Sequence, residues 1–220
     1  MKLIILAAGF ATRLAPLTNN CAKPLLPINH RPMIEHILDR FKYQKEIDEV
    51  FVVSNHRFLS DFRSWADGVM GIYNFTISIL DDGSTSNQSR RGAVGALAFA
   101  LTESNTTEAI VVAGDNLFSE SPDVMKDFFS NIRPKSVLLG LHDVGSLKKA
   151  RNYGVVGLGR NQQVISFQEK PAVPNSTLVS TALYYFPDTA VKLIKTYLEN
   201  QDCPDNLGEM IRRMVGTVIS

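Results

Sequence analysis

Along the first half of the chain, apolar positions form two kinds of pattern, and segments of one kind are followed by segments of the other. One is a short apolar or alternating run, which is typical of a strand buried in a sheet. The other is an apolar stripe at helical spacing, such as Ile34, Ile37, Leu38 and Phe41 after Pro32. The predicted strands are residues 3–6, 49–54, 75–80 and 109–113, and the predicted helices begin at Pro32 or span residues 56–65 and 92–101. This alternation predicts an α/β fold, with a mostly parallel central sheet covered by helices on both faces.

From about residue 153 the pattern changes to short strands joined by turns. Strands are predicted at residues 153–157, 164–167 and 178–186, a helix at 189–199, and the start of a last strand at 215–219. The polar turn between the first two strands is typical of an antiparallel hairpin. We therefore expect a single domain, residues 1–220. Its second half, residues 151–220, adds a small antiparallel portion that forms the other wall of a cleft.

Composition narrows the class of protein. With 220 residues, 45% of them hydrophobic, the chain can bury the core of one domain. Its formal charge of +1 gives no reason to expect nucleic acid or an anionic membrane as a partner. No apolar run reaches the roughly 18 residues of a membrane-spanning helix, and the first run stops at Gly9 before a charged motif, unlike a signal peptide. Two cysteines, Cys21 and Cys203, make no disulfide framework, so we expect a cytoplasmic protein.

The first predicted strand leads into the motif around which the chain is organised. The strand ends in Ala-Ala-Gly, residues 7–9, which are small enough for the backbone to lie close to a ligand. A hydroxyl and a guanidinium follow at Thr12 and Arg13, and Lys23 lies further on in a segment stiffened by prolines. Free backbone N–H groups, a hydroxyl and fixed cations are the combination that polyphosphate recognition needs.

Residues 3–28 resemble the signature of the sugar-phosphate nucleotidylyltransferases, which reads approximately L-A-A-G-x-G-T-R-L-x-P-L-T, four residues, and K-P-L-L-P-[IV]. The chain departs from it at Ala11, where many members have a second glycine, and at Ala22, where proline is usual. Both replacements are small. The resemblance implies a Rossmann-like sheet in which residues 1–150 bind a nucleotide and residues 151–220 bind a sugar phosphate.

A polar, turn-rich segment, residues 81–91, resembles the base-recognition loop of this family. From the residues alone it is either a ligand-binding loop or a solvated loop with ordinary capping residues. The pattern does not distinguish uridine, thymidine, guanosine, cytidine and adenosine. The resemblance implies nucleotide contacts at Leu6, Ala8, Gly9, Phe10, Ala11, Thr12, Arg13, Lys23, Asp82, Gly83, Gly92 and Gly95.

Asp115 follows Gly114 at the end of the strand predicted at residues 109–113. A carboxylate at this position is either a turn former or a ligand for Mg²⁺, which takes few protein oxygens beside phosphate and water. The pair resembles the family's G-D motif, which implies that Asp115 binds a catalytic Mg²⁺.

A third set of residues resembles the family's sugar-1-phosphate pocket. Its motifs are Tyr-Gly-Val at Tyr153 and Gly154 and Glu-Lys-Pro at Glu169 and Lys170, with Thr181 on the following predicted strand. The resemblance implies that Glu169 accepts hydrogen bonds from sugar hydroxyls and that Lys170 binds the sugar phosphate as a compact cation.

The reaction implied is attack by a sugar-1-phosphate oxygen on the α-phosphorus of a nucleoside triphosphate, with release of pyrophosphate. Arg13, Lys23 and Asp115 are the implied catalytic residues. Arg13 holds the leaving β- and γ-phosphates, while Lys23 and Mg²⁺ on Asp115 meet charge at the α-phosphate. Positioning and charge neutralisation do most of the work in such a transfer, and an ionised phosphate oxygen requires no general base.

Two alternatives stay open: a cytidylyltransferase for another phosphorylated alcohol such as phosphocholine, and a non-catalytic nucleotide- or sugar-binding regulator. The second is motivated by a late W-x-D-x-G motif of the family, with a second metal-binding aspartate, that this sequence lacks; its only tryptophan is Trp65. We therefore expect that the chain is truncated and binds nucleotide, and that its catalysis is weak or absent. An unpaired edge at residues 215–219 would favour a homo-oligomer.

Overall fold

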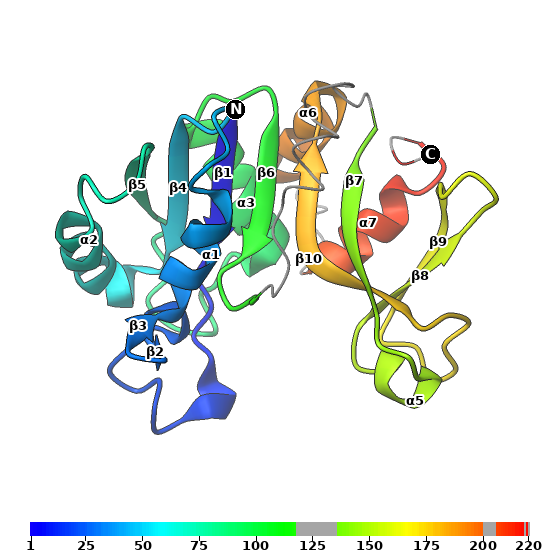
Figure 1. Ribbon diagram of the computed structural model, residues 1–220, viewed down its shortest axis with the longest axis horizontal. Helices are drawn as coiled ribbons and strands as arrows, with labels where there is room; N and C mark the ends of the chain where they lie inside the picture. Colours follow the sequence, from blue (N-terminus) through cyan, green and yellow to red (C-terminus); the bar gives the residue numbers. More distant parts are fainter. Residues whose placement is uncertain (118–135, 200–205, 218, 220) are drawn as a thin grey trace.

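An eight-stranded sheet forms the centre of the protein (Figure 1). The computed structural model describes residues 1–117, 136–199, 206–217 and 219. Along the sheet the strand order is β5-β4-β1-β6-β10-β8-β9, and β7 also pairs with β10. The sheet therefore has a parallel part and an antiparallel part, joined through β10.

The parallel part is made of four strands that the sequence predicts. They are β1 (Lys2–Leu6), β4 (Glu49–Ser54), β5 (Thr76–Asp81) and β6 (Ala109–Ala113). β1 lies between β4 and β6 and is parallel to both. Its residues alternate between two cores: Leu3 and Ile5 belong to one cluster and Ile4 to the other. A strand with apolar residues on both faces needs helices on both sides, as predicted.

The antiparallel part consists of β7 (Leu138–Asp143), β8 (Gly154–Leu158), β9 (Val164–Glu169) and β10 (Leu178–Phe186). The end of β10 pairs with β6 and its beginning pairs with β8, whereas β7 pairs with residues at both ends of β10. The register of β10 with β7 shifts between Ser180 and Tyr184, and Ala182 within this interval has a φ of 52°. This irregularity lets one strand serve both parts of the sheet.

Helices cover both faces. α1 (Met33–Phe41) and α2 (Leu59–Gly68) pack in one cluster, and α3 (Gly92–Glu103), α6 (Asp188–Glu199) and α7 (Leu207–Met214) in the other. The short elements are η1 (Thr12–Leu14), η2 (Lys23–Leu25), η3 (His56–Phe58), α5 (Leu147–Ala150) and the hairpin of β2 (Pro27–Ile28) and β3 (Arg31–Pro32). Among the described helices, none is long and apolar enough to cross a membrane. The mixed α/β architecture is the predicted one.

Three local expectations differ from the structure. Residues 56–65 form a 3₁₀ turn followed by α2, instead of one helix. The strand expected at residues 215–219 is wrong, because the chain turns back on itself there: Val215 and Ile219 form an isolated bridge, and Gly216 N donates to Ile219 O at 3.0 Å. The proposed unpaired edge thereby loses its basis. β7 and α7 were not predicted.

Candidate functional site

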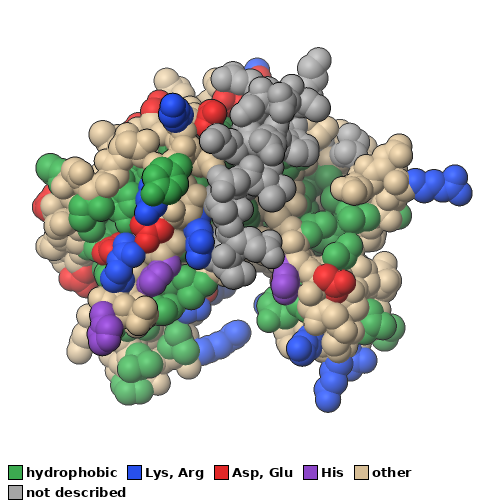
Figure 2. Space-filling model, in the orientation of Figure 1, with side chains coloured by type: hydrophobic (Ala, Val, Ile, Leu, Met, Phe, Trp, Pro, Cys, Tyr) green, Lys and Arg blue, Asp and Glu red, His purple; other side chains and the backbone are tan. Residues whose placement is uncertain are grey.

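The four parallel strands all end at the same edge of the sheet, and the loops that follow them meet there. Gly114 N, after β6, donates to Leu6 O at the end of β1 at 2.9 Å. Ala7 N in turn donates to Val53 O in β4 at 2.9 Å. Because the carboxyl ends of parallel strands are where open α/β sheets bind ligands, this edge is the candidate site. Figure 2 shows a notch between the two halves of the molecule at this edge, with Lys and Arg side chains on both sides.

The loop after β1 has the conformation that its sequence motif requires. Gly9 is exposed, and a Cβ added to it would meet no atom within 4 Å, so the backbone is open to a ligand. Ala11 has a φ of 46°, in the left-handed region that favours glycine, which explains the family preference for glycine at this position. The carbonyl of Ala11 accepts hydrogen bonds from Leu14 N and Thr18 Oγ1, both at 2.9 Å.

Asn55, which the sequence analysis missed, holds this loop to the end of β4. Its side chain is fully buried; Nδ2 donates to Ala8 O at 3.0 Å, and Oδ1 accepts from Phe58 N at 3.1 Å. An asparagine directly after a strand and before a short helix is a capping signal. That signal identifies the cap, but only the fold shows that the other end of the amide reaches the first loop.

Lys23 and Asp115, two of the predicted catalytic residues, form an ion pair at this edge. Lys23 Nζ donates to Asp115 Oδ2 at 2.7 Å, although the residues are 92 positions apart. Gly114 makes the approach possible, because a Cβ there would lie 3.0 Å from Leu6 O and 3.2 Å from Pro24 Cγ. The side chain of Lys23 is 29% exposed and that of Asp115 is 50% exposed, so an incoming ligand can reach both.

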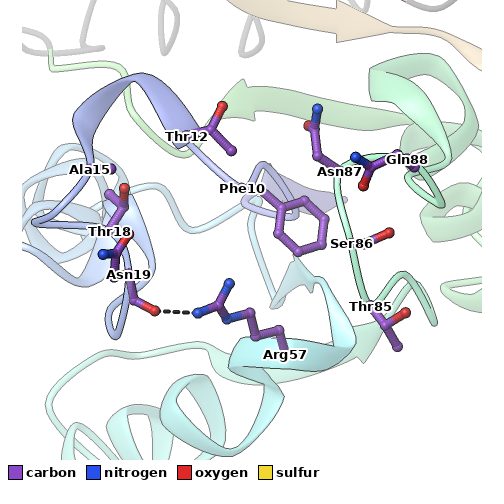
Figure 3. Close-up of a pocket in the computed structure, with 10 residues that line it drawn as sticks. All are labelled: Phe10, Thr12, Ala15, Thr18, Asn19, Arg57, Thr85, Ser86, Asn87 and Gln88. Carbon is purple, nitrogen blue, oxygen red and sulfur yellow. Dashed lines mark hydrogen bonds between the residues drawn. The ribbon is translucent and has the colours of Figure 1, made fainter.

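A pocket of about 320 Å³ lies between the loop after β1, η3 and the loop after β5 (Figure 3). Of the predicted nucleotide contacts, Phe10 and Thr12 line it. Its other lining residues are Ala15, Thr18, Asn19, Arg57, Thr85, Ser86, Asn87 and Gln88. Arg57 donates to the carbonyl of Asn19 and so connects two walls of the pocket. The pocket combines an aromatic ring, a guanidinium and three side-chain amides.

Asp82 lies within the loop after β5 and shapes it. Its side chain is buried, and the carboxylate accepts from Ser84 N at 2.8 Å and Ser84 Oγ at 2.5 Å. Arg91 Nε donates to the Asp82 carbonyl at 2.6 Å. Of the predicted glycines, Gly83 has a φ of 77°, and Gly92 begins α3 with a φ of 73°. The residues expected to read the base therefore set the loop's path, while Asn87 and Gln88 face the pocket.

The same loop is tied to η3 by a contact between the side chains of His56 and Asp81. His56 Nδ1 lies 2.6 Å from Asp81 Oδ2, and Gly83 N donates to Asp81 Oδ1 at 2.8 Å. Burial acts to raise the pKa of Asp81, but the hydrogen bonds from His56 and Gly83 outweigh it, so that the pKa lies below its ordinary value. His56 N also donates to Ser84 O at 2.9 Å, which completes the attachment.

The residues predicted to bind the sugar phosphate lie in or next to strands of the antiparallel part of the sheet. Lys170 N donates to Tyr153 O at 3.0 Å, so the two motifs are adjacent in space. Lys170 Nζ lies 3.8 Å from Glu169 Oε1, and the Lys170 side chain is 61% exposed. Thr181, in contrast, donates its hydroxyl to the carbonyl of Gly140 in β7 at 3.0 Å. The structure thus brings four of the five predicted residues together and uses the hydroxyl of the fifth to pair strands.

A metal ion at this site would have to be held largely by the phosphates of a bound substrate. Among the described residues, no group of three or more His, Cys, Asp or Glu side chains is placed to hold a metal ion. Asp115 offers a half-exposed carboxylate at a strand end. Such a donor set does not fit an all-protein metal cage, but it fits Mg²⁺, which binds through one or two carboxylates plus substrate phosphates.

Comparisons with known proteins show which family the chain resembles. A family model described as nucleotidyl transferase matches residues 2–218. The bifunctional protein GlmU of Methanocaldococcus jannaschii is 24% identical over 98% of this chain and 47% of its own length. A UTP–glucose-1-phosphate uridylyltransferase of Synechocystis sp. is 30% identical over 88% of this chain and 51% of its own. The chain thus spans about half the length of these curated relatives.

Two further relatives carry similar names. A glucose-1-phosphate thymidylyltransferase of Neisseria meningitidis is 30% identical over 89% of this chain and 64% of its own length. A crystal structure from Bacillus anthracis, assigned as a glucose-1-phosphate thymidylyltransferase and solved with sucrose, superposes with a TM-score of 0.69 at 26% identity. The superposition covers 91% of this chain and 75% of the Bacillus anthracis chain. The match of the family model over nearly all of the chain, on a fold that assembles the expected motifs at one edge, shows that this protein belongs to the nucleotidyl transferase family.

Proposed function

We propose that this protein transfers a nucleoside monophosphate from a nucleoside triphosphate to a sugar-1-phosphate, giving a nucleotide sugar and pyrophosphate. The observation that carries the proposal is the Lys23–Asp115 pair, 2.7 Å apart at the carboxyl edge of the parallel strands. A cation and a carboxylate that are both partly exposed provide the two charges needed beside a triphosphate. The names of the relatives support a sugar-1-phosphate as acceptor.

The nucleotide binds along the loop after β1 in this proposal. Open backbone around Gly9 accommodates the phosphates, and the exposed Arg13 in η1 holds the β- and γ-phosphates. The pocket beside Phe10 takes the base and ribose, since a few hundred Å³ with an aromatic wall and polar groups is typical of a small-molecule site. Asn87 and Gln88 offer amide donors and acceptors to the base edge.

The acceptor lies against the antiparallel part, where Lys170 binds its phosphate and Glu169 its hydroxyls. When the nucleotide binds, Lys23 leaves its ion pair with Asp115, contacts the α-phosphate and stabilises the charge that develops there. Mg²⁺, held by Asp115 together with the phosphates, would neutralise further charge at the same place. The protein supplies orientation and charge, and the acceptor phosphate is already an anion at neutral pH.

A matrix of triphosphates against phosphate acceptors tests the proposal. ATP, CTP, GTP, UTP and dTTP are each combined with several sugar-1-phosphates and with phosphocholine in the presence of Mg²⁺, and pyrophosphate release is followed. We expect turnover with at least one sugar-1-phosphate, and a loss of roughly 10²-fold or more in Lys23→Met. Lys192→Met, which alters an exposed ion pair on α6, serves as the matched control. Turnover with phosphocholine alone, or nucleotide binding without any turnover, would overturn the proposal.

A further inference from the structure

Glu169 packs against the beginning of α7 at a place where only glycine leaves room for it. A Cβ added to Gly208 would lie 2.1 Å from Glu169 Oε2 and 2.9 Å from its Cδ. Both distances are far below a van der Waals contact. The position of the Glu169 carboxylate therefore depends on the missing side chain of a residue in another element.

The same glycine also borders Phe167, two positions before Glu169 on β9. A Cβ at Gly208 would lie 3.1 Å from Phe167 Cε1, and one at Gly154 would lie 2.4 Å from Phe167 Cζ. The buried ring is thus held between two glycines, one on β8 and one on α7. Because Phe167 and Glu169 lie on the same face of β9, α7 contacts both.

The first turn of α7 is itself firmly placed. Asn206 Oδ1 accepts from Glu209 N at 2.8 Å, which caps the helix. Met210, Ile211 and Met214 are fully buried and fix the helix in the core. A carboxylate resting on this turn therefore has a defined position. The positive end of the helix dipole also favours its charge.

We infer that Gly208 is a positioning residue that sets the Glu169 carboxylate for binding the acceptor. The inference rests on the proposed function, because it needs Glu169 to contact the sugar phosphate. Adding a methyl group at Gly208 displaces a flexible carboxylate more easily than it displaces a buried helix. Gly208→Ala consequently changes acceptor binding while the protein remains folded.

Calorimetric titrations of the full chain test this inference. Glucose-1-phosphate, mannose-1-phosphate and N-acetylglucosamine-1-phosphate are titrated first, and the one that binds the parent most tightly is used for the variants. We expect Gly208→Ala to weaken its binding about tenfold or more, the scale of one hydrogen bond to a charged group. The dissociation constant for the triphosphate should stay within about twofold, since the nucleotide loops are unchanged. Gly68→Ala is the control, because a Cβ there meets no atom within 4 Å.

A second variant pair shows whether Gly208 acts through Glu169. In a Glu169→Ala background the added methyl group has no carboxylate to displace, so Gly208→Ala should cause no further loss. An equal loss in both backgrounds, or unchanged binding in Gly208→Ala, would overturn the inference and leave the proposed function standing. Failure of the parent to bind any of the three sugar phosphates would remove both.

If Gly208→Ala does not fold, Asn206→Ala replaces it. This change loosens the first turn of α7 without adding atoms at Gly208, and we expect the same selective loss of acceptor binding. Asn206→Ser retains a capping oxygen and should restore it. Equal acceptor binding in Asn206→Ala and the parent would contradict the inference.

Discussion

The proposed reaction depends on a few side chains whose partners can change. The Lys23–Asp115 ion pair is partly exposed, and such pairs contribute little to stability, typically up to about 1 kcal/mol. Its main consequence is placement, because each group holds the other at the candidate site. A triphosphate that approaches this edge offers Lys23 a more highly charged partner and leaves Asp115 free to bind a cation.

Asp115→Asn tests the role of this carboxylate. The amide keeps the shape and removes the charge, so Mg²⁺ should bind more weakly and pyrophosphate release should fall steeply. We expect the Mg²⁺ titration curve to move to higher concentration and activity to recover only in part. Superimposable curves for the variant and the parent would mean that Asp115 is structural. Asp67→Asn, on the surface of α2, is the control.

Ala11→Gly tests the left-handed residue in the loop after β1. At a φ of 46° an alanine costs about 1–2 kcal/mol that glycine avoids, which exceeds the roughly 0.5–1 kcal/mol of extra entropy that glycine loses on folding. We expect a gain of up to about 1 kcal/mol in the free energy of unfolding, measured by urea denaturation. Ala66→Gly in α2 should show the opposite sign, a loss of about 1 kcal/mol. Destabilisation of both variants alike would contradict the argument.

At the scale of elements, hydrogen bonds between the ends of neighbouring strands and the adjoining loops hold the loops of the candidate site in place. The end of β5 is fastened to η3 through Asp81 and His56, and the end of β4 is fastened to the loop after β1 through Asn55. The contacts lie at strand ends, where backbone groups are no longer paired within the sheet. Polar side chains there satisfy the backbone and set the course of each loop.

Asp81→Asn should change stability in a pH-dependent way. The folded-state pKa of Asp81 is lower than in the unfolded chain, so its stabilisation is complete above the unfolded value of about 3.9 and is lost as pH falls through the folded value. We expect Asp81→Asn to cost up to about 1 kcal/mol at pH 7, with the difference from the parent shrinking as pH falls below the unfolded value. Urea denaturation at several pH values measures it. A cost that is constant across this range would show that the charge is unimportant.

At the scale of the whole molecule, β10 connects two parts of the sheet that carry the two groups of predicted site residues. The parallel strands carry the loops with Lys23 and Asp115, whereas Tyr153 directly precedes β8 and Glu169 ends β9. The two halves lie on either side of the notch in Figure 2. A two-substrate reaction fits this arrangement, since each half can bind one substrate and the sheet sets their distance.

Lys170→Ala tests this division of roles. The exposed lysine should affect only the acceptor, so the Michaelis constant for sugar-1-phosphate should rise by about tenfold or more, the scale of one charged hydrogen bond. Calorimetric binding of the triphosphate alone should remain nearly unchanged. Lys192→Ala on α6 is the control for loss of a surface charge. Lost nucleotide affinity in Lys170→Ala would contradict the division.

Local patterns in the sequence were sufficient for most elements and for the order of the motifs. The buried runs at β1, β4 and β6 appear as apolar segments because a strand covered on both faces has few polar positions. The stripe of α1 is equally direct, since apolar residues at helical spacing have one arrangement that buries them. β7 and α7 were not predicted, although they are about as long as elements that were.

What the sequence determined by itself is therefore the α/β class, the strands of the parallel half and the candidates Lys23, Asp115, Glu169 and Lys170. Only the tertiary structure decided which of these meet. It pairs Lys23 with Asp115, directs the Asp82 carboxylate to Ser84 within its own loop and places Gly208 against Glu169. The physical reason is distance along the chain: periodicity reports contacts between near neighbours, whereas these contacts arise from the order of strands in the sheet and from helix packing.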